Sequence, residues 1–366
     1  MTGNRTVGDP QKTQNPDSHT QQTPSIAAWA LTVHGLSLAE RIADAVEDVH
    51  IHVSTGVACE QTAYRRFDRL SDAVATQFQA YGGHIFIMST GIVVRVIAGL
   101  LRHKTVDPAV VVMDDAGRHA VSLLSGHLGG ANRLAETVAQ IVGADPVITT
   151  ATDVHQLPAI DMLAADCGLI IENPGAIKAV NMAILAHRPI RLHDPLGVFL
   201  KQVNGLQWAP WTTGASATPG VFVDDIQAGA TNDVLVLRPA TLCAGIGCNR
   251  GTDAAEIRQL LTSAIKAHGL AIGSLHQIGT IDIKRDEPGI LSVARDLGCA
   301  MAFYTKDELN RVADVPTPSE IVKKHTGAKS VCEAAAILAS RMGVLVVPKQ
   351  TTKNVTVAIA RIGSPS

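Results

Sequence analysis

One stretch near the middle of the chain constrains the fold more than any other. Residues 122–153 read SLLSGHLGGANRLAETVAQIVGADPVITTATD, which is a strand end, a glycine-rich loop, a helix and a threonine-rich strand. Its length matches one βαβ unit. Gly126, Gly129 and Gly130 let backbone N–H groups converge at the start of a helix predicted from Ala131, where the helix dipole favours an anion. The spacing fits neither GxGxxG nor GxxxxGK[ST], so the stretch predicts an anion-binding loop unlike the common nucleotide-binding motifs.

Composition limits the class of protein. The chain has 366 residues, 46% of them hydrophobic and 17% charged, which suits two or three domains each with its own core. A formal net charge of -2 argues against nucleic acid as a partner. We expect residues 1–25, which are polar and rich in Gln, Thr, Asn and Pro, to be a disordered tail.

No run of residues resembles a signal peptide or a membrane span, so a cytoplasmic protein without a membrane partner is expected. The six cysteines do not form the framework of a secreted disulfide protein. Cys243 and Cys248 are spaced poorly for structural zinc, and no second cysteine pair completes a site. We therefore predict no protein-bound metal.

Short apolar runs alternate with amphipathic helices from residue 28 onward. The pattern predicts strands over 29–35, 50–55, 84–90, 107–114, 118–125 and 146–153, with helices over 37–46 and 71–83 and others starting near 91 and 131. Residues 114–117, which read DDAG, predict a hairpin turn. This order is typical of an α/β domain with a largely parallel sheet, here over residues 28–155.

The rest of the chain divides into two parts. Residues 156–240 are weakly patterned and read as a smaller middle segment with helices near 155–168 and 175–186. A second α/β domain is predicted over 241–363, with a strand and glycine turn at 242–251, a helix capped by Thr252 or Asp253, and a closing hairpin. Lys284 and Glu287 follow a strand of this domain as a charged pair, for which an exposed ion pair is the simpler interpretation. Ser330 and Glu333 have the spacing of a capping box.

Ligands of parallel sheets bind beyond the carboxyl ends of the strands. The strands predicted to end at Thr90 and Asp153, and the loop from Ser125 to Asn132, all place polar groups at strand ends. We therefore expect these three segments to share one polar cleft.

Two sets of segments resemble a known family. Residues 91–153 are similar to the amino-terminal domain of the CbiG family, and GIGCNRG, IDIKRDEPG and SVCEAAAILAS resemble its carboxy-terminal domain. This family comprises the cobalt-precorrin-5A hydrolases of anaerobic cobalamin biosynthesis. The resemblance implies an enzyme that opens the ring A δ-lactone of a cobalt-bearing tetrapyrrole and releases carbon C20 with its methyl group as acetaldehyde. Cobalt arrives inside the substrate, so no protein cofactor is implied, and neighbouring enzymes of the pathway are the implied partners.

Hydrolysis of a lactone needs an activated water, donors to the carbonyl oxygen and an acid for the leaving alkoxide. His127 is the best candidate base, although a histidine that ties down its own loop is the alternative. The other predicted catalytic residues are Ser125, preferred as a donor to substrate, together with Lys104 and Asp153. The predicted substrate-binding residues are Thr90, Gly91, Arg95, Gly126, Gly129, Gly130, Asn132, Thr149, Thr150, Gly245, Gly247 and Lys284.

Other interpretations of these residues stay open. Lys104 and Arg95 also fit a solvated helix face, and Asp107 and Asp115 fit turn caps. The same loops would suit a non-catalytic protein that binds a corrinoid intermediate and delivers it. A different acyl or phosphoryl hydrolase on this scaffold is a third possibility, because fold does not fix the reaction.

Overall fold

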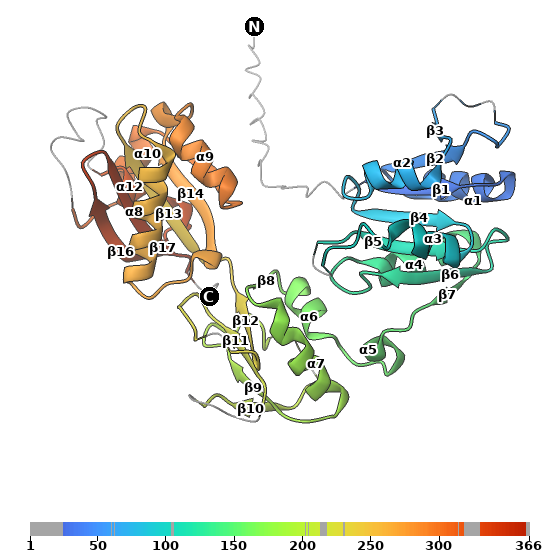
Figure 1. Ribbon diagram of the computed structural model, residues 1–366. Coiled ribbons are helices and arrows are strands. Elements are labelled where there is room, and N and C mark those ends of the chain that lie inside the picture. The colour runs from blue at the N-terminus through green and yellow to red at the C-terminus, as the bar shows by residue number, and fades with distance from the viewer. Residues whose placement is uncertain are drawn as a thin grey trace, which may run out of the picture. The chain divides into compact units, whose positions relative to one another are not determined.

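The computed structural model describes residues 25–59, 61, 63–103, 106–201, 203, 205–212, 218–229, 231–313, 315–317 and 330–363. Within them the chain forms three separate sheets, shown in Figure 1. The chain divides into two compact units, and the boundary between them along the sequence lies between Ile148 and Thr149. The first unit holds one sheet and the second holds two. The tail predicted over residues 1–25 lies almost wholly outside the described residues.

The first unit is a seven-stranded sheet in the order β3-β2-β1-β4-β5-β6-β7. The strands from β3 to β5 are parallel, β6 runs antiparallel to β5, and β7 is parallel to β6. The strands are β1 (Ile26–Ala30), β2 (Val49–Ser54), β3 (Arg65–Phe67), β4 (Gly83–Ile87), β5 (Ala109–Met113), β6 (His119–Leu124) and β7 (Asp145–Val147). The helices are α1 (Val33–Ala45), α2 (Leu70–Gln77), α3 (Thr90–Ile97) and α4 (Ala131–Val142).

Both faces of this sheet are buried, as expected of a parallel sheet. Residues of α1 and α4 pack on one face with Ala28, Val111 and Met113. Residues of α2 and α3 pack on the other with Trp29 and Phe86. The predicted α/β class is therefore confirmed, and the helix predicted from Ala131 begins there.

Two predicted strands were wrong in extent. The strand predicted over 29–35 is β1, which ends at Ala30, because Thr32 already caps α1 by accepting a hydrogen bond from the N–H of Gly35. The strand predicted over 146–153 ends at Val147, and a short helix α5 (Ala151–Val154) follows it. The threonines at 149, 150 and 152 thus follow a strand end rather than continuing a strand.

The second unit begins with a five-stranded sheet in the order β10-β9-β11-β12-β8, where the sequence pattern was weak. Its strands are β8 (Ile170–Ile171), β9 (Ile190–His193), β10 (Trp208–Pro210), β11 (Gly220–Val223) and β12 (Val234–Arg238), and all but β8 are parallel. The helices α6 (Ile160–Asp166) and α7 (Ile177–Leu185), with the 3-10 turn η1 (Pro174–Ala176), contribute to its core.

The last sheet has the order β15-β14-β13-β17-β16, in which β13 to β15 are parallel, β17 is antiparallel to β13, and β16 is antiparallel to β17. Its strands are β13 (Leu242–Cys248), β14 (Leu275–Ile281), β15 (Ala300–Tyr304), β16 (Val344–Thr351) and β17 (Val355–Arg361). The helices are α8 (Ala254–Ala267), α9 (Pro288–Asp296), α10 (Lys306–Arg311) and α12 (Cys332–Ala339), with 3-10 turns η2 (Ile272–Ser274) and η3 (Asp282–Lys284). Asp253 is the N-cap of α8, as predicted.

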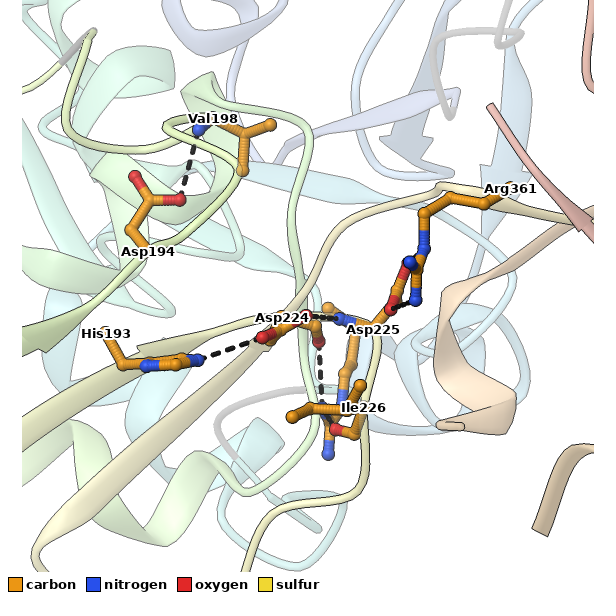
Figure 2. A network of polar contacts seen from close by, with 8 residues as sticks. His193, Asp194, Val198, Asp224, Asp225, Ile226 and Arg361 are labelled. Carbon is orange, nitrogen blue, oxygen red and sulfur yellow. Dashed lines mark hydrogen bonds and ion pairs between the residues drawn. The ribbon is translucent and has the colours of Figure 1, made fainter. Parts of the chain in front are cut away.

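A buried carboxylate joins the middle and carboxy-terminal sheets. Asp225 follows β11, is fully buried, and accepts two hydrogen bonds of 2.7 Å from the guanidinium of Arg361 at the end of β17 (Figure 2). The hydroxyl of Thr241 donates a third, of 2.8 Å. An Arg–carboxylate pair with both N–H groups engaged fixes direction as well as distance, so the two sheets are held in one unit.

The first unit contains a buried histidine whose protonation state is set by its neighbours. Trp29 Nε1 donates to Nδ1 of His84, and Nε2 of His84 lies 3.0 Å from the carbonyl oxygen of Phe78, which can only accept. His84 is therefore neutral with its proton on Nε2. Burial lowers the pKa of His84 to about 4. Burial, followed by the charges of Arg65, His84 and His50, lowers the pKa of His52 to about 4 as well.

These two pKa values predict that the first unit loses stability in mild acid. The unfolded chain binds protons below about pH 6.5, whereas the folded chain excludes them until about pH 4. The free energy of unfolding should fall by about 2 kcal/mol per histidine between pH 7 and pH 5. Urea unfolding at pH 7 and pH 5, monitored by hydrogen exchange of peptides from β1 and β4, measures this change in the free energy of unfolding. His84→Gln should remove about half of this pH dependence, because His52 remains, and an unchanged slope in that variant would contradict the assignment.

Candidate functional site

The loop after β6 is compact and largely bonded to itself. Ser125 has a left-handed backbone with φ 58°, and its hydroxyl donates to the carbonyl of Asp107 at 3.0 Å. Gly129 lies so close to Ser125 that a Cβ at 129 would stand 2.3 Å from the Ser125 Cβ. Only glycine fits at 129, and the reason is packing within the loop.

Two backbone N–H groups at the start of α4, where the sequence predicts an anion site, donate hydrogen bonds within the loop. The N–H of Ala131 donates to the Ser125 carbonyl at 3.1 Å, and that of Asn132 donates to the Gly126 carbonyl at 3.0 Å. Asn132 is buried, and its side chain accepts from the Ser122 hydroxyl at 2.6 Å. These two N–H groups of the helix start are therefore not offered to a ligand, because the loop folds back to satisfy them itself. His127 is half-buried, and its carbonyl accepts from the N–H of Gly130.

The loop and the end of β4 lie at opposite edges of the first sheet. Leu124, the last residue of β6, pairs with Val110 near the start of β5, whereas Thr90 follows the end of β4. The predicted single cleft was therefore wrong for these two segments. The physical reason is the hairpin at residues 114–117, which reverses the chain direction between β5 and β6.

The other candidates of the first sheet bond within their own helix or turn, or fall outside the described chain. Thr90 and Gly91 begin α3, and Arg95 lies in its last turn, from where its guanidinium donates to the Gly91 carbonyl at 2.9 Å. Asp107 accepts the N–H of Arg102, which is the turn cap that the sequence allowed. Lys104 lies outside the described residues.

Thr149, Thr150 and Asp153 belong to the second unit. Thr149 is exposed, and Thr150 precedes α5, where its hydroxyl donates to the Asp153 carboxylate at 2.5 Å. This contact closes the first turn of a four-residue helix. It gives Asp153 a local structural partner.

A cavity of about 560 Å³ opens at the carboxyl ends of β13 and β14 in the last sheet. It is of the size that holds organic ligands in proteins. Two of the predicted binding residues, Gly247 and Lys284, line it. The other lining residues come from the ends of these strands, the start of α12 and the β16–β17 turn, namely Cys248, Asn249, Arg250, Ile281, Ile283, Ser330, Val331, Cys332, Lys349, Thr351, Thr352, Lys353, Asn354, Val355 and Thr356.

Lys284 and Glu287 form a buried ion pair beside this cavity. Lys284 Nζ lies 2.9 Å from Glu287 Oε2, and the two side chains are 11% and 0% exposed. The other carboxylate oxygen of Glu287 accepts the N–H of Gly251 at 2.7 Å. Burial alone would raise the pKa of Glu287, but the bonds from Lys284 and Gly251 bring it below its usual value. The simpler interpretation of an exposed ion pair was wrong, because the turn at Gly251 folds over the carboxylate.

Gly245 does not line the cavity and instead serves the packing of α12. A Cβ on Gly245 would stand 1.8 Å from the carbonyl oxygen of Cys332, and one on Gly279 would stand 2.8 Å from that of Ala335. The absence of side chains at both positions lets α12 lie directly on β13 and β14. We therefore attribute Gly245 to the helix–sheet contact.

The predicted capping box at Ser330 and Glu333 was wrong. The N-cap of α12 is Val331, and Glu333 is fully buried. Its carboxylate accepts the N–H and hydroxyl of Thr317 and the N–H of Lys349, at 2.7 to 3.1 Å. Glu333 thus ties the cavity wall at Lys349 to α12, which only the folded chain reveals.

The middle sheet has an organised histidine that the sequence did not reveal. His193 ends β9, and its Nε2 lies 2.9 Å from the carboxylate of Asp224, which follows the parallel strand β11 (Figure 2). The His193 ring stacks on Phe222 with centroids 4.4 Å apart. His193 and Asp224 come from strands thirty residues apart, in a region without a clear hydrophobic pattern. No short motif in the sequence therefore indicates that they pair.

Comparisons with known proteins cover nearly the whole chain. Family models match residues 72–153 (Cobalamin synthesis G N-terminal), 158–239 (Cobalamin biosynthesis central region) and 242–360 (Cobalamin synthesis G C-terminus). The chain belongs to the cobalamin synthesis G family. A relative from Priestia megaterium, named cobalt-precorrin-5A hydrolase, is 33% identical over 93% of this chain and 96% of its own length.

Other members of the cobalamin synthesis G family match over similar lengths. A protein of the same name from Salmonella typhimurium is 33% identical over 88% of this chain and 94% of its own. The crystal structure of a cobalamin biosynthesis protein G homolog from Sulfolobus solfataricus is 21% identical, with a TM-score of 0.35, over 93% of this chain and 97% of that one. In the part of the chain that the structure describes, no helix is both long and apolar enough to cross a membrane.

The buried Lys284–Glu287 pair makes a testable energetic prediction. Lys284→Met leaves a buried carboxylate without its cation and should lower the free energy of unfolding by about 3–5 kcal/mol. Adding Glu287→Gln, which keeps an acceptor for Gly251, should recover most of that loss. Urea denaturation of both variants tests this, with Arg250→Gln as the control. Arg250 and Asp286 form an exposed pair, so the control should cost under about 1 kcal/mol. Equal losses in the single and double variants would contradict a buried pair.

Proposed function

We propose that this protein is a cobalt-precorrin-5A hydrolase that opens the ring A δ-lactone and releases acetaldehyde. The observation that carries the proposal is the length of the similarity, since relatives with that name match from the first sheet to the last. A protein that only delivers a corrinoid is less favoured, because the full-length relatives are named as hydrolases.

The proposed reaction balances without a redox partner. Water adds to the lactone carbonyl and the acyl C–O bond breaks, which gives a carboxylic acid and an alcohol on C20. Loss of the alcohol proton lets its oxygen form a carbonyl while the bond from C20 to the macrocycle breaks. The electron pair of that bond enters the conjugated macrocycle, which takes up a proton, and acetaldehyde leaves. Cobalt belongs to the substrate in this scheme, so the protein supplies only acid, base and hydrogen-bond donors.

His127 is our candidate for the base of this reaction. It lies on a compact loop after β6 that is hydrogen-bonded to itself, and histidine is the side chain that most often serves as a general base. Ser125 is better suited to holding the loop than to attacking substrate, because its hydroxyl donates to the Asp107 carbonyl. The proposed roles of Lys104 and Asp153 stay predictions.

Acetaldehyde release tests the function directly. The purified protein and cobalt-precorrin-5A should yield one acetaldehyde per substrate, measured through NADH consumption by alcohol dehydrogenase. His127→Ala should lower turnover by about a hundredfold or more, as for loss of a general acid–base group. His119→Ala, which removes an exposed histidine at the start of β6, should leave turnover unchanged. Absence of acetaldehyde with the wild-type protein would overturn the function, whereas full activity of folded His127→Ala would overturn only the base.

A further inference from the structure

The cavity of the last sheet combines a cationic rim with an apolar wall. We propose that it binds one edge of the tetrapyrrole, with carboxylate side chains of the macrocycle on its lysines and the ring edge against its apolar wall. The inference rests on the proposed function for the identity of the ligand. It adds the place in the chain where the acidic groups of that ligand are held.

The charge of the lining is one-sided. Four cationic residues line the cavity, Arg250, Lys284, Lys349 and Lys353, and none of the described lining residues is acidic. Glu287 neutralises Lys284, and Asp286 offsets Arg250. The Lys349 ammonium donates to the neutral carbonyl of Thr317, so its charge is not cancelled there. Glu333 accepts the backbone N–H of Lys349, and Glu256 accepts from both neighbours of Lys353, but neither carboxylate belongs to the lining. The charged side chains that a ligand meets in the described lining are therefore cationic, which favours an anionic group there.

The lysines retain donors for that ligand. An ammonium group carries three N–H bonds, and Lys284 uses one of them on Glu287. Its side chain is almost buried, so its remaining donors work in a site of low dielectric, where charged hydrogen bonds are strong. A carboxylate entering the cavity would meet these donors at little entropic cost, because Glu287 already fixes the amine.

The turn that carries Lys353 is also held in place. Glu256 of α8 accepts from the Thr352 hydroxyl at 2.6 Å and from the Asn354 amide at 3.1 Å. A second amide contact of 3.2 Å joins Asn249 to Asn354. Lys353 thus lies between two anchored residues at the rim.

The apolar wall distinguishes this cavity from a site for small inorganic anions. Ile281, Ile283, Val331 and Val355 line it together with the thiols of Cys248 and Cys332. Burial raises the pKa of both thiols, so they stay neutral near pH 7. A ligand that covers this wall needs an apolar body beside its acidic groups. A tetrapyrrole with acetate and propionate arms has that combination, and only part of it enters a cavity of about 560 Å³.

Binding of two cobalt corrinoids tests the proposal. Cobyrinic acid keeps the carboxylates, and cobinamide carries amides in their place. Lys349→Gln/Lys353→Gln should weaken cobyrinic acid binding about tenfold or more, reduce its salt dependence, and leave cobinamide affinity within about twofold. The matched control Lys178→Gln/Lys306→Gln removes two exposed lysines away from the cavity and should change neither affinity. Calorimetry on the full-length chain measures the wild type and both double variants with each of the two corrinoids.

Three results would overturn the proposal. The first is wild-type affinity of Lys349→Gln/Lys353→Gln for cobyrinic acid, and the second is an equal loss for both corrinoids. The third is displacement of cobyrinic acid by equimolar inorganic phosphate, which would show a general anion site. Acetaldehyde release by the wild-type protein separates the two claims. The expected binding pattern without acetaldehyde supports this site and refutes the hydrolase, and acetaldehyde with unaffected binding does the reverse.

Discussion

The carboxy-terminal domain depends on how closely α12 approaches the sheet beneath it. Gly245 and Gly279 present no side chain, so backbone atoms of α12 contact the strands directly. This approach sets Val331 and Cys332 at the wall of the cavity and places Glu333 under the β16 strand, where it accepts the N–H of Lys349. One steric condition at two glycines therefore fixes the wall of the candidate site, its buried carboxylate and the strand that carries a lysine.

Fully buried carboxylates are the second organising feature of this unit. Asp225, Glu287 and Glu333 have no exposed surface, and each accepts hydrogen bonds from segments that are distant in sequence. A charge in such surroundings is stable only when several donors surround it. Each of these acids thus requires donors from separate segments to be correctly juxtaposed, and Asp225 and Glu287 each require a cation as well. They specify the arrangement of elements at the cavity and at the joint between the sheets.

The sequence predicted local structure, such as helix starts and caps, better than it predicted which segments lie side by side in the folded chain. Periodicity and caps located α4 at Ala131 and the N-cap at Asp253, because these depend on a few adjacent residues. The prediction of a single cleft failed at the loop after β6, although the hairpin predicted at 114–117 already implied that β6 runs opposite to β5 and carries this loop away from the end of β4. The middle sheet was not predicted because its strands have two to five residues, which are too few to show an alternating hydrophobic pattern. Lys284, which the sequence predicted to bind substrate, lines a cavity, while its burial follows from the turn at Gly251 that no spacing encodes.

The ion pair between Asp225 and Arg361 crosses the boundary between two sheets. A division of the chain into separate sheets would therefore separate the two partners of a buried ion pair. A fragment starting at residue 241 would keep all five strands of its sheet, yet it would carry a guanidinium shaped to a carboxylate that is gone. The complementary fragment would expose to water the carboxylate of Asp225, which is fully buried in the whole chain. Each half would then present an unmatched charge where the other had been, so the residues around 225 and 361 belong to the same folding unit although they lie on separate sheets.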